Sequence, residues 1–183
     1  MITEWGNMHM GVCTVALYDT LGVDAFKYIV NQTELITVVC SGDFVEKITK
    51  NKVEDSTGRL QRLQYLVSFD PVKDDVLKAA EGAGLRVYTF AEVLEQGQQN
   101  QLELIEPDSM DTFMLSYTSG TTGDPKGVKL THRMITMMNY NNNVRTGSET
   151  GDLLTHEDVY LSYLPLAHSM EQGIMGACAL WGL

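Results

Sequence analysis

Short apolar runs alternate with stretches of helical periodicity along most of this chain, and this alternation limits the folds that it can adopt. Runs rich in Val, Ile, Leu, Tyr and Phe are typical of buried strands. Such runs occur at Val12 to Tyr18, Leu35 to Cys40, Leu63 to Phe69, Leu85 to Phe90, Thr112 to Tyr117 and Val159 to Leu164. Alternation of strands with helices favours a mostly parallel sheet. The sequence therefore predicts an α/β fold of about six strand–helix units.

Amphipathic stretches between these runs predict the helices that flank the sheet. Their apolar residues recur at helical spacing, as Val23, Phe26 and Val30, then Val76, Leu77 and Ala80, then Met134, Met137 and Met138. Gly84 closes the second stretch, as glycine commonly does at the end of a helix. We expect these faces to pack on the sheet, and we interpret the methionines as core residues.

The composition is that of a folded globular protein, with 44% hydrophobic and 20% charged residues among 183. The formal net charge is -11. A surface of this sign repels polyanions such as nucleic acids and anionic lipid headgroups. We therefore expect no nucleic-acid partner.

Cysteine usage and hydropathy bear on the compartment. Three cysteines lie far apart with no C-x-x-C pair, which indicates a reducing, intracellular setting. The first residues include Glu4 and no basic cluster, unlike a secretory signal. No apolar run approaches the roughly 18 to 20 residues that span a bilayer. We expect no membrane span in this chain.

A segment rich in Gly, Ser and Thr directly follows one of the predicted strands. It reads Leu115-Ser-Tyr-Thr-Ser-Gly-Thr-Thr-Gly-Asp-Pro-Lys-Gly127 and leads, after Val128 to Leu130, into a helix expected near Thr131. A loop between a strand and a helix is a common phosphate-binding context. Its glycines allow backbone N–H groups to approach an anion. Further donors that fit a polyphosphate are the hydroxyls of Thr118, Ser119, Thr121 and Thr122 and the ammonium of Lys126.

Two other interpretations of this segment are a Walker-type loop and a plain surface loop. A Walker-type phosphate loop requires G-x-x-x-x-G-K-[S/T], but Gly123 is followed by Asp124 and Pro125, and Lys126 by Gly127. A plain surface loop would also be rich in Gly, Ser and Thr. The combination of glycines, hydroxyls, a Pro-Lys-Gly ending and a preceding strand favours phosphate binding.

At these residues the chain resembles the adenylate-forming (AMP-binding) enzymes, whose signature is similar to Y-T-S-G-T-T-G-D-P-K-G. A second segment, Tyr163 to Glu171, resembles the L-P-L-A-H-x-x-E element of long-chain acyl-CoA synthetases. A third, Ala16 to Gly22, resembles their P-L-Y-D-T-L-G element. The resemblance covers the entire chain and favours the long-chain branch of the superfamily.

The resemblance implies the activation of a long-chain fatty acid to acyl-CoA. In such enzymes the carboxylate attacks the α-phosphate of ATP with the help of Mg²⁺, pyrophosphate leaves, and CoA then attacks the acyl adenylate. By the match, Lys126 would steady the loop or the departing pyrophosphate. The residues that would hold the β- and γ-phosphates are Thr118, Ser119, Gly120, Thr121, Thr122 and Gly123.

His168 is the candidate catalytic residue. It follows Pro165-Leu-Ala at the predicted end of a strand, where open parallel sheets bind ligands, and by resemblance it would lie near the acyl adenylate. It could equally cap the helix that follows. Glu171 falls in the first turn of that helix, where the helix dipole favours an acidic side chain in any protein. His9, His132 and His156 lack ligand spacing, so we predict no protein-built metal site.

Several parts of the family pattern are missing, so we interpret residues 1–183 as a partial N-terminal AMP-binding domain without the C-terminal lid domain. The missing parts are the segment whose Glu contacts magnesium, the ribose-binding Asp and the lid with its lysine. The chain stops at Leu183 inside the apolar run that begins at Gly173, which we take as truncation. The chain alone is then not expected to catalyse adenylation.

Alternatives to a long-chain ligase remain open in the sequence. One is a truncated nucleotide-binding homologue that catalyses nothing, and another is an adenylate-forming ligase that acts on an aryl or short-chain acid. For the parent protein, the resemblance implies the cytoplasmic side of the cell, with attachment to the endoplasmic reticulum or another organelle membrane as an option.

Overall fold

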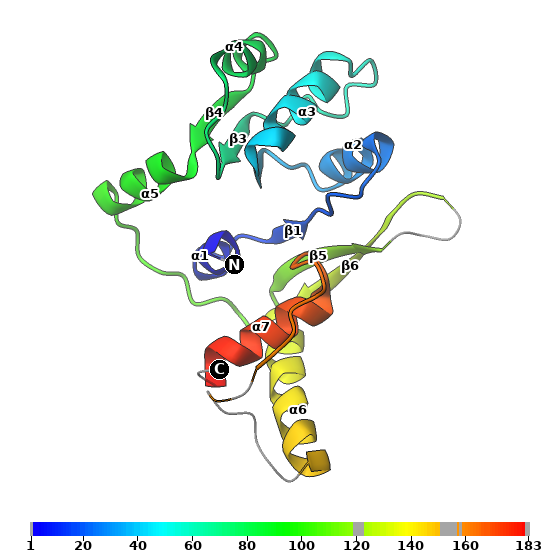
Figure 1. Cartoon of the computed structure of the whole chain (residues 1–183), viewed down its shortest axis with the longest axis vertical. Helices are drawn as coiled ribbons and strands as arrows, with labels where there is room; N and C mark the ends of the chain where they lie inside the picture. The colour runs from blue at the N-terminus through cyan, green and yellow to red at the C-terminus, as the bar shows by residue number, and fades with distance from the viewer. Residues whose placement is uncertain (1, 119–122, 151–156, 158, 182–183) are drawn as a thin grey trace. The chain divides into compact units, whose positions relative to one another are not determined.

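A computed structural model describes residues 2–118, 123–150, 157 and 159–181, and the chain divides into two compact units. One unit combines Met1–Thr20 with Leu104–Leu183, and the other is Leu21–Glu103. Each unit has its own three-stranded sheet with helices around it (Figure 1). The predicted α/β class is confirmed, with the strands divided between two sheets.

The unit that contains both chain ends carries the sheet of order β1-β5-β6. Strand β1 runs parallel to β5, and β6 pairs with β5 in antiparallel orientation. Ala16, Phe113 and Met114 are buried at its centre. The elements of this unit are α1 (Ile2–His9), β1 (Thr14–Ala16), β5 (Thr112–Thr118), β6 (Lys126–Thr131), α6 (His132–Thr150) and α7 (Ser169–Trp181).

The second unit is a parallel sheet of order β2-β3-β4. The crossovers are helices, as parallel neighbours require. Ile29, Leu60, Leu63 and Leu66 are fully buried in its core. Its elements are α2 (Val23–Gln32), β2 (Thr37–Cys40), α3 (Gly42–Val53), β3 (Tyr65–Ser68), α4 (Asp74–Gly82), β4 (Arg86–Thr89) and α5 (Phe90–Gln99).

Five of the predicted apolar runs contain strands, but the last prediction is wrong. Residues 159–164, all of which the structure describes, are irregular coil. Val159 and Leu161 are 97% and 78% exposed, so these two side chains are not packed in a core as those of a buried strand would be. An apolar run becomes a strand only where a neighbour satisfies its backbone N–H and C=O groups.

The prediction that the methionine stripe packs on the sheet is also wrong for two of its members. Met134 and Met137 are 54% and 48% exposed. The side of α6 that faces inward instead presents Ile135, which packs against the core, and Asn139, which is buried. Because these two positions are four residues apart, they lie on one face of the helix.

In the described part of the chain, no helix combines the length and apolar character needed to cross a bilayer.

The end of α4 illustrates a local rule that the sequence predicts correctly. Gly84 has φ +72°, and the N–H groups of Gly84 and Leu85 donate to the carbonyls of Glu81 and Ala80. This pattern is a Schellman motif, which places its glycine in the left-handed region. Replacement of Gly84 by Ala should lower the free energy of unfolding of this unit by about 1–2 kcal/mol. Urea unfolding measures the change, and Gly82→Ala, inside the same helix, is the control that should not lose stability.

Candidate phosphate-binding site

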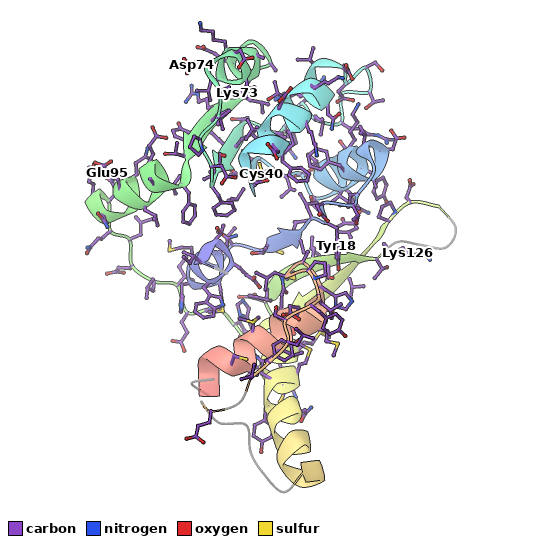
Figure 2. The ribbon with its side chains drawn as sticks, viewed as in Figure 1. Tyr18, Cys40, Lys73, Asp74, Glu95 and Lys126 are labelled. Carbon is purple, nitrogen blue, oxygen red and sulfur yellow. The ribbon has the colours of Figure 1, made fainter. Side chains whose placement is uncertain are left out.

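The predicted phosphate loop connects β5 to β6 in an antiparallel hairpin. Thr118 is the last residue of β5 and faces Lys126, the first residue of β6, across the ladder. The Thr118 hydroxyl donates to the carbonyl oxygen of Lys126 at 3.5 Å. Figure 2 shows Lys126 where β6 begins, at the base of the loop. Four predicted phosphate ligands, Ser119, Gly120, Thr121 and Thr122, lie outside the described residues.

The hairpin corrects the expected order of strand, loop and helix. Strand β6 stands between the loop and α6, which begins at His132, one residue after the expected start. The N-terminus of α6 is therefore separated from the loop by six strand residues, and its dipole falls off within the first turn. Phosphate binding here would depend on the loop's own N–H groups, its hydroxyls and Lys126.

Two glycines at the ends of this loop have conformations or neighbours that exclude a side chain. Gly123 has φ +104°, where residues with a Cβ are strained. Gly127 lies opposite Tyr117 in the ladder, and a Cβ on it would be 2.9 Å from Cζ of the tyrosine ring. Tyr117 is 5% exposed, so its ring has little room to move. The ring over Gly127 therefore sets the spacing of the two strands where the loop begins and ends.

His168 lies in a turn before α7 and not at the end of a strand, which corrects the predicted context. Its backbone N–H donates to the carbonyl oxygen of Pro165 at 2.8 Å. Its Nδ1 accepts the backbone N–H of Met170 at 3.2 Å, so the ring caps the helix. Since Nδ1 is an acceptor, the proton of the neutral ring lies on Nε2. The capping that the sequence left open as an alternative is present, and Nε2–H is a donor.

The turn that carries His168 and the loop-bearing hairpin share one hydrophobic core. Ala167, next to His168, packs against the cluster of Ala16, Phe113 and Met114. Leu130 of β6 packs against the same cluster. The fold thus brings two segments that are separate in the sequence onto the same sheet.

The burial of Glu171 is the site feature that the sequence did not predict. Its side chain is 1% exposed and accepts hydrogen bonds from the hydroxyls of Tyr160, at 2.9 Å, and Ser162. Loss of water around the Tyr160 hydroxyl, together with the hydrogen bond to Glu171, raises the pKa of Tyr160 to about 12. Tyr160 therefore stays protonated and donates at neutral pH. The sequence pointed to Glu171 through its place in the first helical turn and in the L-P-L-A-H-x-x-E element, and neither signal predicts burial.

The described residues contain no cluster of three or more His, Cys, Asp or Glu side chains that could hold a metal ion. His132, one of the histidines considered above, packs its ring edge-on against Phe113, with 5.4 Å between the centroids. The Cys13, Cys40 and Cys178 thiols are free.

Comparison with protein families and curated relatives places these features in context. The model of the AMP-binding enzyme family matches residues 1–183. The chain is 34% identical over 176 residues to fatty acyl-CoA synthetase A of Dictyostelium discoideum, covering 96% of this chain and 25% of that protein. It is 33% identical over 187 residues to long-chain-fatty-acid–CoA ligase 5 of Rattus norvegicus, covering 97% of this chain and 26% of the relative.

Solved structures share the fold at lower identity. The adenylation domain of a carboxylate reductase from Mycobacterium chelonae matches with a TM-score of 0.76 at 18% identity, over 98% of this chain and 28% of that one. A long-chain-fatty-acid-CoA ligase from Archaeoglobus fulgidus matches with a TM-score of 0.59 at 22% identity, over 99% and 31%. The chain thus spans about a quarter of the length of the curated relatives that it matches.

Proposed function

The chain belongs to the AMP-binding enzyme family, and we propose that the full-length gene product activates a long-chain fatty acid to its acyl-CoA through an acyl adenylate. The observation that carries the proposal is the hydroxyl- and glycine-rich loop between β5 and β6, with Lys126 at its end. The relatives with about one-third identity, one named a fatty acyl-CoA synthetase and the other a long-chain-fatty-acid–CoA ligase, support the choice of acid.

The proposed chemistry asks the protein to position reactants and to neutralise charge. A carboxylate that attacks the α-phosphate of ATP displaces pyrophosphate, and negative charge builds up on the leaving group. The loop hydroxyls and N–H groups and the Lys126 ammonium would hold the β- and γ-phosphates and stabilise this charge. His168 would present Nε2–H to an oxygen of the acid or of the adenylate, because its Nδ1 is engaged by Met170.

Mg²⁺ and CoA complete the proposed set of ligands. Mg²⁺ supplies further charge neutralisation on the phosphates when it is bound. It keeps several waters and commonly binds through substrate phosphates, which suits a loop rich in hydroxyls. The thiol of CoA would then attack the acyl carbonyl and release AMP.

The activity is tested by ATP–pyrophosphate exchange with the full-length gene product. Palmitate should support exchange, whereas acetate and coumarate should support it at least about tenfold less well, because a hydrophobic acyl site gains about 0.8 kcal/mol for each buried methylene. Preference for coumarate or acetate would indicate another adenylate-forming ligase. Binding of ATP without exchange on any acid would indicate a nucleotide-binding homologue that does not catalyse.

The assigned loop role predicts a loss of exchange when its donors are removed. Replacement of Lys126 or Thr121 by Ala should lower kcat/KM for ATP by about tenfold each, because each change deletes a hydrogen bond to a charged phosphate. Lys129→Ala is the matched control for charge, since Lys129 lies exposed on the same strand. Full activity in the Lys126 and Thr121 variants would refute the assigned role.

A further inference from the structure

Glu171 occupies a position in α7 where an acidic residue usually stabilises the helix. It is the third residue of the helix, after Ser169 and Met170. A glutamate there usually remains in solvent near the helix dipole, or turns back to the residue that caps the helix. The Glu171 side chain is instead 1% exposed and reaches the hydroxyls of Tyr160 and Ser162. Helix stabilisation alone does not explain this geometry.

The two hydroxyls belong to the irregular segment that leads into the Pro165 to His168 turn. Tyr160 and Ser162 donate to the two different oxygens of the Glu171 carboxylate. A buried carboxylate that lost these donors would lack compensation for the water that it gives up. The contact therefore holds coil and helix together and closes a loop of chain that contains His168.

His168 is fixed inside this closed loop at three points. Its N–H donates to the carbonyl of Pro165, its carbonyl accepts from the N–H of Gln172, and its Nδ1 accepts from the N–H of Met170. The last two contacts belong to the first turn of α7, the same turn that carries Glu171. Any shift of that turn would therefore move the His168 ring and its Nε2–H.

We propose that Glu171 is a positioning residue, which aims His168 by tying Tyr160 and Ser162 to the first turn of α7. The inference rests on the proposed function, because it assumes that His168 meets the acid or the adenylate. Glu171 itself need not touch the substrate, and its burial beneath the two hydroxyls suits a role exerted through His168. Its carboxylate acts as a hydrogen-bond acceptor and not as a base.

Activity of the full-length gene product tests the positioning role. Glu171→Ala should lower kcat for palmitate-dependent exchange by about tenfold and leave KM for ATP unchanged, because misplaced groups reduce the chemical step. Glu171→Gln should stay within about threefold of the natural protein, since an amide can bond to both hydroxyls. If Gln were as damaging as Ala, the charge itself would be needed and the positioning role would be wrong.

A double-mutant cycle separates action through His168 from general loss of structure. In a His168→Ala background, Glu171→Ala should cause no further loss of kcat, because the group that it positions is gone. Additive losses would overturn the proposal. Tyr160→Phe removes one of the two hydrogen bonds and is the milder variant if Glu171→Ala does not fold. Tyr163→Phe removes a hydroxyl from the same segment, at a side chain 69% exposed, and should leave activity unchanged.

Hydrogen exchange tests the structural half of the proposal without any turnover. In Glu171→Ala, backbone amides of residues 159–175 should exchange at least about tenfold faster, as local opening becomes easier. Amides of residues 21–103 should be unaffected. Unchanged hydrogen exchange at residues 159–175 would refute the proposal that Glu171 ties this segment to α7, even if the enzyme is active. If the natural protein activates no acid, the proposed function fails, whereas accelerated exchange would still show that Glu171 holds this segment.

Discussion

Replacement of Gly127 by Val should reduce the ATP-dependent activity of the full-length gene product by about 100-fold, the loss expected when a reacting group is displaced by about 1 Å. The first carbon of the new side chain would lie 2.9 Å from Cζ of Tyr117 and 3.2 Å from its Cε1 and hydroxyl oxygen. Heavy atoms do not pack this closely, and Tyr117 is buried. The two strands must therefore separate at the base of the predicted phosphate loop.

The expected loss of activity should come from the displaced loop and not from unfolding of the protein. Pyrophosphate exchange measures activity, and circular dichroism with urea unfolding checks that the variant still folds. Gly97→Val is the matched control, because a Cβ on Gly97 meets nothing within 4 Å and this helix tolerates Val better than Gly. Activity of Gly127→Val within about threefold of the natural protein would show that the spacing set by Tyr117 does not position the phosphate ligands.

The importance of Gly127 could not be seen in the sequence, although the loop itself could. Glycines, hydroxyls and a lysine in one run are local information, and they are sufficient to single out the segment. The contact between Gly127 and Tyr117 depends on the antiparallel pairing of β5 with β6. The sequence does not predict that pairing, because β6 carries Lys126 and Lys129 and is largely exposed. Such a strand lacks the apolar run by which buried strands are recognised.

The fold was predictable where burial and local rules agree. Strands β2, β3 and β4 coincide with apolar runs because a parallel sheet covered by helices demands them. The end of α4 at Gly84 follows from backbone sterics alone. By contrast, the exposed run at residues 159–164 has the composition of a strand but lies in coil. Composition shows that a segment is able to form a strand. Whether it does so depends on a pairing partner that is distant in the sequence.

The same limit applies to the side chains near His168. The sequence left open whether His168 caps a helix or meets a substrate, and the structure shows that Nδ1 caps the helix, which leaves Nε2 free to face a ligand. For Glu171 the sequence left open a role in stabilising the helix dipole and a functional role. Its burial depends on Tyr160 and Ser162, which come from a segment whose conformation the sequence misassigned.

The largest loss of stability is expected from Asp55→Ala, in the unit formed by Leu21–Glu103. The Asp55 side chain is 4% exposed and lies 3.6 Å from the ammonium of Lys27. It also accepts hydrogen bonds from the hydroxyl and N–H of Thr57 and from the N–H of Leu60. Its removal leaves a largely buried ammonium and two backbone donors without compensation. The free energy of unfolding should fall by about 3 kcal/mol, as is typical when one partner of a buried pair is deleted.

The lowered pKa of Asp55 makes the stability of this unit depend on pH. Burial alone would raise this pKa, but the hydrogen bonds from Thr57 and Leu60 and the nearby Lys27 outweigh burial and hold it below its ordinary value. A lowered pKa in the folded state means that the ionised carboxylate stabilises the fold above about pH 4. This contribution is lost as the pH falls through the folded-state pKa. Stability of the natural protein should therefore decline below about pH 4 more steeply than that of Asp55→Ala.

The neighbouring carboxylate provides the control for both expectations. Glu54 is 60% exposed and pairs with Lys50 at 4.0 Å within one helical turn. An exposed pair of this kind contributes less than about 1 kcal/mol, so Glu54→Ala should lower the free energy of unfolding only slightly. Urea unfolding at pH 7 and at pH 3, with hydrogen exchange of residues 21–103, measures both variants. Equal effects of Asp55→Ala and Glu54→Ala would mean that the buried network does not stabilise this unit. A large loss from Asp55→Ala alone, smaller at pH 3 than at pH 7, would assign the stabilisation to the ionised Asp55 carboxylate.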